Sequence, residues 1–219
     1  MHHEIHGQLA HYLRLTFDQG ETCWAGKGAI MSYGDGITWG LRVPGGVGGA
    51  ARRMLSGEGL GLAHVQAERS GVSASFASNR PGTVSIWNLA DCPLLTTRGS
   101  FLAAWGDVDI SVTVARRAGA ALFGGAGLFL QRLSGQGMVA IHAAGDLDQR
   151  RLASGETLTV STGHLAAFDD GIDYDIEYVG GLRKALFSGE GVFMTRLRGP
   201  GEVLLQTLKR KREIATRGK

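Results

Sequence analysis

GETCWAGKGAIMSYGDGI, at residues 20–37, returns as GETLTVSTGHLAAFDDGI at residues 155–172 with no gap between the aligned positions. A degenerate third copy lies between them, starting at Cys92 and ending at Asp107-Val108. Each copy is followed by a second shared element, SGEGL, GGAGL or SGEGV, which starts at residue 56, 124 or 188. The two elements are 36, 32 and 33 residues apart in the three copies. Repetition at such regular spacing predicts three tandem structural units.

Between the glycine-rich turns, apolar and polar residues alternate with the period of a β-strand that has one wet face. The clearest examples are residues 13–17, 84–86, 108–114 and 172–178. The 35 glycines against 4 prolines suit tight turns, because glycine reaches positive φ without steric cost. No stretch of twelve or more residues shows a convincing helical period. We therefore predict an all-β fold.

The second shared element predicts a β-hairpin in which two short strands flank a Gly-x-Gly turn. The turn is Gly135-Gln136-Gly137 in the middle copy and Gly199-Pro200-Gly201 in the last. The first copy is longer and ends at Arg69-Ser70-Gly71. Because a unit of roughly 65 residues is marginal alone, we expect the three to pack as β-sandwich units of one domain over residues 1–208. The predicted repeats are about 4–75, 76–142 and 143–208, followed by a basic tail at 209–219.

Composition narrows the class of protein. A hydrophobic content of 43% is typical of an ordinary globular chain, and no apolar run is long enough for a transmembrane helix. The N-terminus lacks the cationic start and apolar core of a signal peptide. Two cysteines, Cys23 and Cys92, are too few for a disulfide scaffold or a four-thiolate zinc site. These features predict a cytoplasmic protein.

The net charge of +3 is unevenly spread, because residues 209–219 carry six basic side chains against one acid. Each copy also has a basic pair ahead of its second element. Polyanion binding therefore has ten candidate residues: Arg52, Arg53, Arg116, Arg117, Arg183, Lys184, Lys209, Arg210, Lys211 and Arg212. The offsets of the pairs differ between copies, and no aromatic residues for base stacking are interleaved with them. A solvated charged surface is therefore favoured over a site for RNA or another polyanion.

No catalytic, cofactor-binding or metal-ligating residue is predicted. Asp35, Asp107 and Asp170 occur in all three copies and are interpreted as aspartates that cap turns through their own backbone. The histidines form no H-x-H or H-E-x-x-H arrangement, which disfavours a metal site. His2, His3 and His6 are placed at a frayed terminus, and His64, His142 and His164 are interpreted as structural histidines with satisfied hydrogen bonds.

Several short strings together carry a family resemblance. They are RMLSGEGL at 53–60, FLAA at 101–104, GLFL at 127–130, GE at 155–156, GHLAAF at 163–168 and GPGEV at 199–203. In this order they resemble the family named after altered inheritance of mitochondria, over residues 4–208. The resemblance implies three tandem units with the fold of the trp RNA-binding attenuation protein, assembled as homo-oligomers that are commonly trimers. This chain departs from the pattern in the short unit before Leu102 and at Ala126.

The sequence thus predicts a non-enzymatic, homo-oligomeric β-scaffold or binding module with an unknown protein partner and no cofactor. Two alternatives stay open at this point. The first is a binder of RNA or another polyanion that uses the basic pairs and the tail. The second is an enzyme whose site forms only between subunits.

Overall fold

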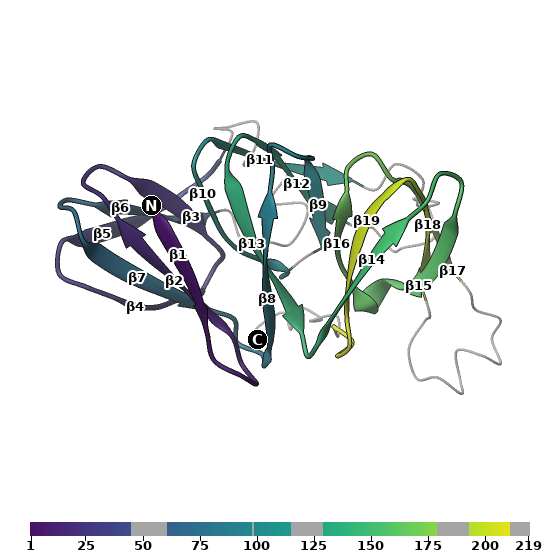
Figure 1. The fold of residues 1–219 in the computed structure, drawn as a ribbon, viewed down its shortest axis with the longest axis horizontal. Helices are drawn as coiled ribbons and strands as arrows, with labels where there is room; N and C mark the ends of the chain where they lie inside the picture. The colour runs from purple at the N-terminus through teal and green to yellow at the C-terminus, as the bar shows by residue number, and fades with distance from the viewer. Residues whose placement is uncertain (45–60, 98, 115–128, 179–192, 211–219) are drawn as a thin grey trace, which may run out of the picture.

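The structure is a computed structural model that describes residues 1–44, 61–97, 99–114, 129–178 and 193–210. Within these residues the fold is built from β-strands, and the single helical element is a short 3-10 turn, η1 (Thr162–His164). The predicted all-β class is confirmed. The strands form four antiparallel sheets, arranged along the long axis of the molecule (Figure 1).

The chain repeats one unit of six strands three times. Unit 1 comprises β2 (Tyr12–Phe17), β3 (Thr22–Ala25), β4 (Ile30–Tyr33), β5 (Ile37–Arg42), β6 (Leu62–Ala67) and β7 (Val72–Ala77). Unit 2 comprises β8 (Gly82–Asn88), β9 (Leu94–Thr97), β10 (Phe101–Trp105), β11 (Val108–Val114), β12 (Phe129–Gly135) and β13 (Met138–Ala144). Unit 3 comprises β14 (Leu147–Leu152), β15 (Thr157–Ser161), β16 (Leu165–Asp169), β17 (Asp173–Tyr178), β18 (Phe193–Arg198) and β19 (Gly201–Gln206).

Every unit pairs its strands in the same way. The sixth strand lies between the first and the third, as in β2-β7-β4. The fifth strand lies between the second and the fourth, as in β3-β6-β5. Each unit therefore contributes two three-stranded antiparallel layers. Alternating burial along β2, where Leu13, Leu15 and Phe17 are buried, matches the period expected of a strand with one face in a core.

The predicted hairpin is wrong. Strands β12 and β13 are joined by a short turn, but β12 pairs with β9 and β11 while β13 pairs with β8 and β10. The turn therefore carries the chain from one layer to the other. Gly135 has φ +122°, a backbone angle that favours glycine, and Gly71 and Gly201 also take positive φ at the turns between the fifth and sixth strands of their units. Period-two alternation shows that both segments are strands, but it does not show which neighbour each strand pairs with.

The ladders also correct the predicted alignment of the middle copy by one residue. Positions that pair with the same place on the fifth strand are equivalent, namely Cys23, Leu94 and Leu158 opposite Val65, Leu133 and Leu197. The middle copy therefore starts one residue earlier than the sequence comparison placed it.

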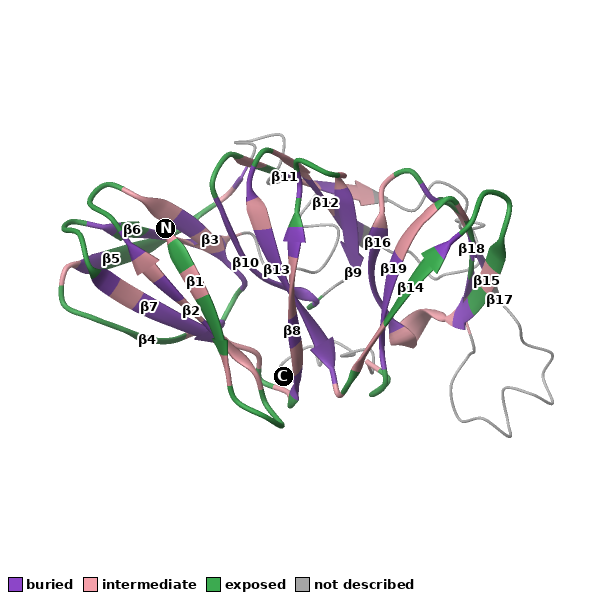
Figure 2. Ribbon diagram, viewed as in Figure 1, coloured by how far each residue is buried: buried purple, intermediate pink, exposed green. Residues whose placement is uncertain are grey.

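Neighbouring units share both sheets and cores. Strand β3 pairs with β10, and β9 pairs with β16, which joins layers into two six-stranded sheets. The core around Leu13 and Phe76 includes Leu102 of unit 2, and the core around Leu133 includes Ala167 of unit 3. Strand β9, at one of these junctions, is buried along its whole length, as its purple colour in Figure 2 shows. The three units thus form one continuous structure.

A further strand, β1 (His2–His6), precedes the repeats and pairs antiparallel with β2. The terminal amino group lies 2.7 Å from Oε1 of Glu21. The prediction of a frayed N-terminus is therefore wrong. Alternation was hard to recognise here, because three of the five residues of β1 are histidines.

Candidate functional site

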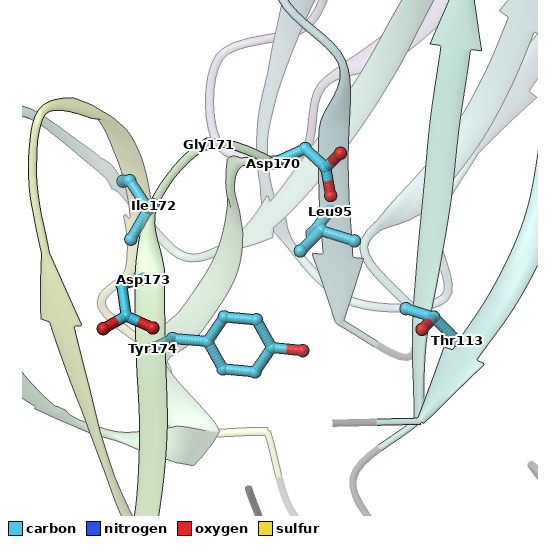
Figure 3. Close-up of a pocket in the computed structure, with 7 residues that line it drawn as sticks. All are labelled: Leu95, Thr113, Asp170, Gly171, Ile172, Asp173 and Tyr174. Atoms are coloured by element: carbon cyan, nitrogen blue, oxygen red, sulfur yellow. The ribbon is translucent and has the colours of Figure 1, made fainter. Parts of the chain in front are cut away.

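A cavity of about 270 Å³ lies where unit 2 meets unit 3. Its walls come from β9 and β11 of unit 2 and from the β16–β17 turn and β17 of unit 3. The lining residues are Leu95, Thr113, Asp170, Gly171, Ile172, Asp173 and Tyr174. Figure 3 shows the ring of Tyr174 reaching across the space toward Thr113, with the carboxylate of Asp170 at the opposite end of the cavity.

Two acidic residues at this junction are held by partners from unit 2. Nε of Arg132, on β12, donates to Oδ2 of Asp170 over 2.9 Å. Sγ of Cys92 donates to Oδ1 of Asp169 over 2.7 Å, and the same oxygen accepts from the backbone N–H of Gly171 at 2.8 Å. These contacts fasten the β16–β17 turn to unit 2. The turn that they hold in place lies at one edge of the cavity.

Two of the three aspartates interpreted as turn caps, Asp35 and Asp170, have a different role. Asp35 accepts from Nη2 of Arg69 at 2.9 Å, and Asp170 accepts from Arg132. It is Asp169 that caps the turn in unit 3. The prediction of a self-capping aspartate is therefore wrong at Asp35 and Asp170, because an arginine from another strand or turn reaches each carboxylate.

The thiols are poor nucleophiles at neutral pH. Burial, the hydrogen bond to Asp169 and the negative charges of Asp169 and Asp170 together raise the pKa of Cys92 to about 12. Burial also raises the pKa of Cys23 well above its usual value. A nucleophilic cysteine needs the opposite shift, toward the thiolate. Both cysteines are free.

Within the described ranges, no group of three or more His, Cys, Asp or Glu side chains converges in a way that could hold a metal ion. Over the same residues, no helix is long and apolar enough to cross a membrane. The lining of the cavity includes a tyrosine ring, a threonine hydroxyl and two carboxylates, which are all groups that can form hydrogen bonds.

Eight of the ten predicted polyanion-binding residues lie outside the described ranges: Arg52, Arg53, Arg116, Arg117, Arg183, Lys184, Lys211 and Arg212.

The two remaining candidates are tied to the body of the protein. The backbone N–H of Arg210 donates to the carbonyl of Gly163 at 2.9 Å. Nη2 of Arg210 donates to the carbonyl of His142 at 3.2 Å and to Oε1 of Gln206 at 2.8 Å. Burial, together with the positive charge of Arg80, lowers the pKa of Arg210 to about 10. Its neighbour Lys209 lies over Gly163. Because the guanidinium of Arg210 is occupied by these hydrogen bonds within the protein, it is not available to bind a polyanion.

The three histidines interpreted as structural, His64, His142 and His164, differ in the contacts that their rings make. Nδ1 of His164 lies 2.8 Å from the carbonyl oxygen of Gln206, and the ring of His64 packs edge-on against Trp24. His142 is 2% exposed, and among the described residues neither of its ring nitrogens has a hydrogen-bond partner. The prediction of satisfied structural histidines therefore fits His164 and is wrong for His142.

Sequence reasoning missed the junction residues. Arg132 and Cys92 lie 38 and 77 residues from the aspartates they bind, and no local pattern links them. A usable signal existed in the third strands: residues 101–104 and 165–168 are continuously apolar or small, which is typical of a strand covered on both faces.

Comparisons with known proteins agree with this architecture. An uncharacterized protein of Streptococcus pyogenes is 28% identical over 204 residues, covering 90% of this chain and 81% of the relative. A crystal structure of a Streptococcus pyogenes protein superimposes with a TM-score of 0.78 at 24% identity, covering 95% of this chain and 94% of that one, and it supports the fold alone. The family model described as Mitochondrial biogenesis AIM24 matches residues 3–208. The chain therefore belongs to the AIM24 family.

Proposed function

We propose that this protein is a non-enzymatic, homo-oligomeric β-scaffold or binding module, and that its subunits assemble as a trimer in the cytoplasm. In this proposal each six-strand unit is a copy of the fold of the trp RNA-binding attenuation protein. The function is to present a repeated β-surface to a protein partner rather than to transform a substrate.

The observation that carries the proposal is a set of large apolar side chains left in solvent on two consecutive strands of unit 1, each at the edge of its own sheet. Met31 and Tyr33 on β4 are each 53% exposed, and Trp39 and Leu41 on β5 are 48% and 70% exposed. Strands β4 and β5 are joined by a short turn at residues 34–36. Large apolar side chains exposed at sheet edges are typical of surfaces that contact another protein chain.

The chemistry of the described side chains supports a role without catalysis. Both thiols have raised pKa values, which keeps them protonated at neutral pH. Asp170, which lines the cavity between units 2 and 3, is engaged with Arg132, and the adjacent Asp169 is engaged with Cys92. These groups are used to fasten one unit to the next.

Mass measurement under native conditions tests the proposal. Light scattering after size exclusion, and native mass spectrometry at micromolar concentration, should give three times the 23.2 kDa mass of the chain. A monomer under these conditions would overturn the proposal. A hydrolytic or transfer activity that needs the assembled protein would favour the inter-subunit enzyme instead.

A further inference from the structure

The units of this chain are joined by one rule that is used twice. The second strand of a unit pairs antiparallel with the third strand of the next unit, as β3 does with β10 and β9 does with β16. No other strand pair in the described residues forms a ladder between units. Within the described residues, two strands have no partner of this kind in another unit: β15, the second strand of the last unit, and β4, the third strand of the first.

The register of the two junctions is the same. Ala25 lies opposite Ala103 and Trp24 opposite Ala104 at the first junction. At the second, Thr96 lies opposite Ala167 and Leu95 opposite Phe168. The ladders within the units make these positions equivalent one by one, with Thr159 and Val160 taking their place on β15 and Tyr33 and Ser32 taking their place on β4.

Burial follows the pairing. Strands β10 and β16, which have a neighbour, are buried almost throughout, whereas β4 is exposed at three of its four residues. Met31 is 53% exposed, while its counterparts Leu102 and Ala166 are 2% and 0% exposed. Strand β15 is likewise more exposed than its counterpart β9. In the described residues, β4 and β15 each lie at the edge of a sheet.

The backbone groups at these two edges are set for the same ladder. The C=O of Glu156, just before β15, accepts a hydrogen bond from the N–H of Gly199, just beyond β18. The direction of the backbone groups alternates from residue to residue along an antiparallel strand, so the N–H and C=O of Thr159 point away from β18. On β4, the N–H of Gly34 donates to Ser73 of β7, so the N–H and C=O of Tyr33 point to the open edge.

We propose that β15 of one protomer pairs antiparallel with β4 of a second copy, continuing the rule that joins the units within the chain. In this contact Thr159 lies opposite Tyr33 of the next copy and Val160 lies opposite Ser32 of that copy. The layer β17-β18-β15 then joins the layer β4-β7-β2-β1 of the neighbour in one sheet. This inference rests on the proposed homo-oligomer and specifies the surfaces that form it.

The contact is head-to-tail, because each copy offers two different surfaces. Such contacts close into a ring when the rotation between copies divides a full turn, and otherwise grow into a filament. A closed ring leaves neither β4 nor β15 as an open sheet edge, and open edges are a known cause of non-specific aggregation. It also buries Met31 and Tyr33, which the single chain leaves in solvent.

Cysteine cross-linking tests the register directly. Val160 and Ser32 of the next copy form a non-hydrogen-bonded antiparallel pair, in which the Cα atoms lie about 4.5 Å apart, within the range of a disulfide. The probe is the Ser32→Cys, Val160→Cys double variant oxidised at low concentration. We expect a ladder of covalent multimers on a non-reducing gel, and no ladder from either single variant alone.

Mixing the two single variants sharpens the test. A head-to-tail contact joins Ser32→Cys of one chain to Val160→Cys of another, so the mixture should give covalent dimers and nothing larger. Cross-linking of Ser32→Cys chains with each other would instead show a symmetric contact and overturn the inference.

Proline substitution tests the edges without cross-linking. Thr159→Pro and Tyr33→Pro each remove an N–H that points to the open edge, and they spare the ladder inside the unit. We expect each to raise the dissociation constant of the assembly about tenfold or more. The matched control is Gln149→Pro on the outer edge of β14, where alternate residues also point away from their only neighbour. This control should leave the assembly unchanged.

The outcomes separate the two proposals. A wild-type monomer would refute the homo-oligomer itself. An oligomer that survives both edge prolines and gives no cross-link would refute the β15–β4 contact and leave the homo-oligomer standing. Circular dichroism of each variant identifies any that fails to fold, and for that variant the cross-linking result decides.

Discussion

Residues 33–35 and residues 168–170 occupy equivalent places in units 1 and 3, yet they have different surroundings. Tyr33 is 53% exposed, and its counterpart Phe168 is fully buried. Asp35 forms an ion pair in solvent, with its side chain 97% exposed, whereas Asp170 is 29% exposed in its ion pair. The difference follows from one neighbour: β16 lies between β19 and β9, whereas β4 pairs with β7 on one side and has no described strand on the other. In this fold, burial at a given position is decided by the preceding unit.

The largest expected effect on stability comes from truncating Phe168, the buried counterpart of Tyr33. Phe168→Ala should lower the free energy of unfolding by about 3–5 kcal/mol, because it removes a fully buried ring that packs edge-on against Tyr174. Tyr33→Ala is the matched control and should cost the isolated chain about 0.5 kcal/mol. Urea denaturation at low protein concentration measures both. Equal costs for the two variants would contradict the role assigned to the neighbouring strand.

The second-largest expected effect on stability comes from His142, a buried histidine on β13 of unit 2. Burial lowers the pKa of His142 to about 4, from an ordinary value of 6.5, and the positive charges of Arg210, His11 and Arg80 contribute. The folded state therefore resists protonation that the unfolded chain accepts. The resulting stability is fully present above pH 6.5 and is lost as the pH falls toward 4, by about 3 kcal/mol.

His142→Gln measures this contribution. The variant lacks the titrating group, so its free energy of unfolding should fall by about 3 kcal/mol less than that of the wild type between pH 7 and pH 4. The carboxylates titrate in both proteins, and the difference between the two profiles isolates His142. Parallel profiles would show that the ring of His142 is protonated in the folded state as readily as in the unfolded chain.

The sequence predicted the class of fold well and the connections between strands poorly. Alternation at residues 108–114 and 172–178 identified strands, because a half-buried strand needs a period of two. The repeats identified three units, because equivalent turns need glycine in equivalent places. The β12–β13 turn was misassigned, since a turn between layers and a turn within a hairpin use the same residues.

Contacts between units were beyond local patterns. The bond from Cys92 to Asp169 spans 77 residues, and the bond from Arg210 to His142 spans 68. Arg210 was grouped with a solvated tail because its sequence neighbours are basic. Its place in the fold depends on the open space over Gly99 and Gly163, where an added Cβ would lie within 3 Å of the side chains of Arg210 and Lys209. The amino-acid composition of the tail does not indicate that this space exists or that Arg210 and Lys209 occupy it.

The smallest effect separates the two ion pairs of the opening comparison. Arg132→Ala should lower the free energy of unfolding by about 1 kcal/mol, because the Arg132–Asp170 pair is partly shielded from water and joins unit 2 to unit 3. Arg69→Ala should cost no more than about 0.5 kcal/mol, because Asp35 and Arg69 are both largely in solvent. Salt sharpens the contrast, since exposed charges are screened more than partly buried ones. Repeating the urea titrations at high ionic strength should abolish the cost of Arg69→Ala and retain most of the cost of Arg132→Ala. If salt removed both costs alike, the junction would give Asp170 no more protection from solvent than Asp35 has at the open edge.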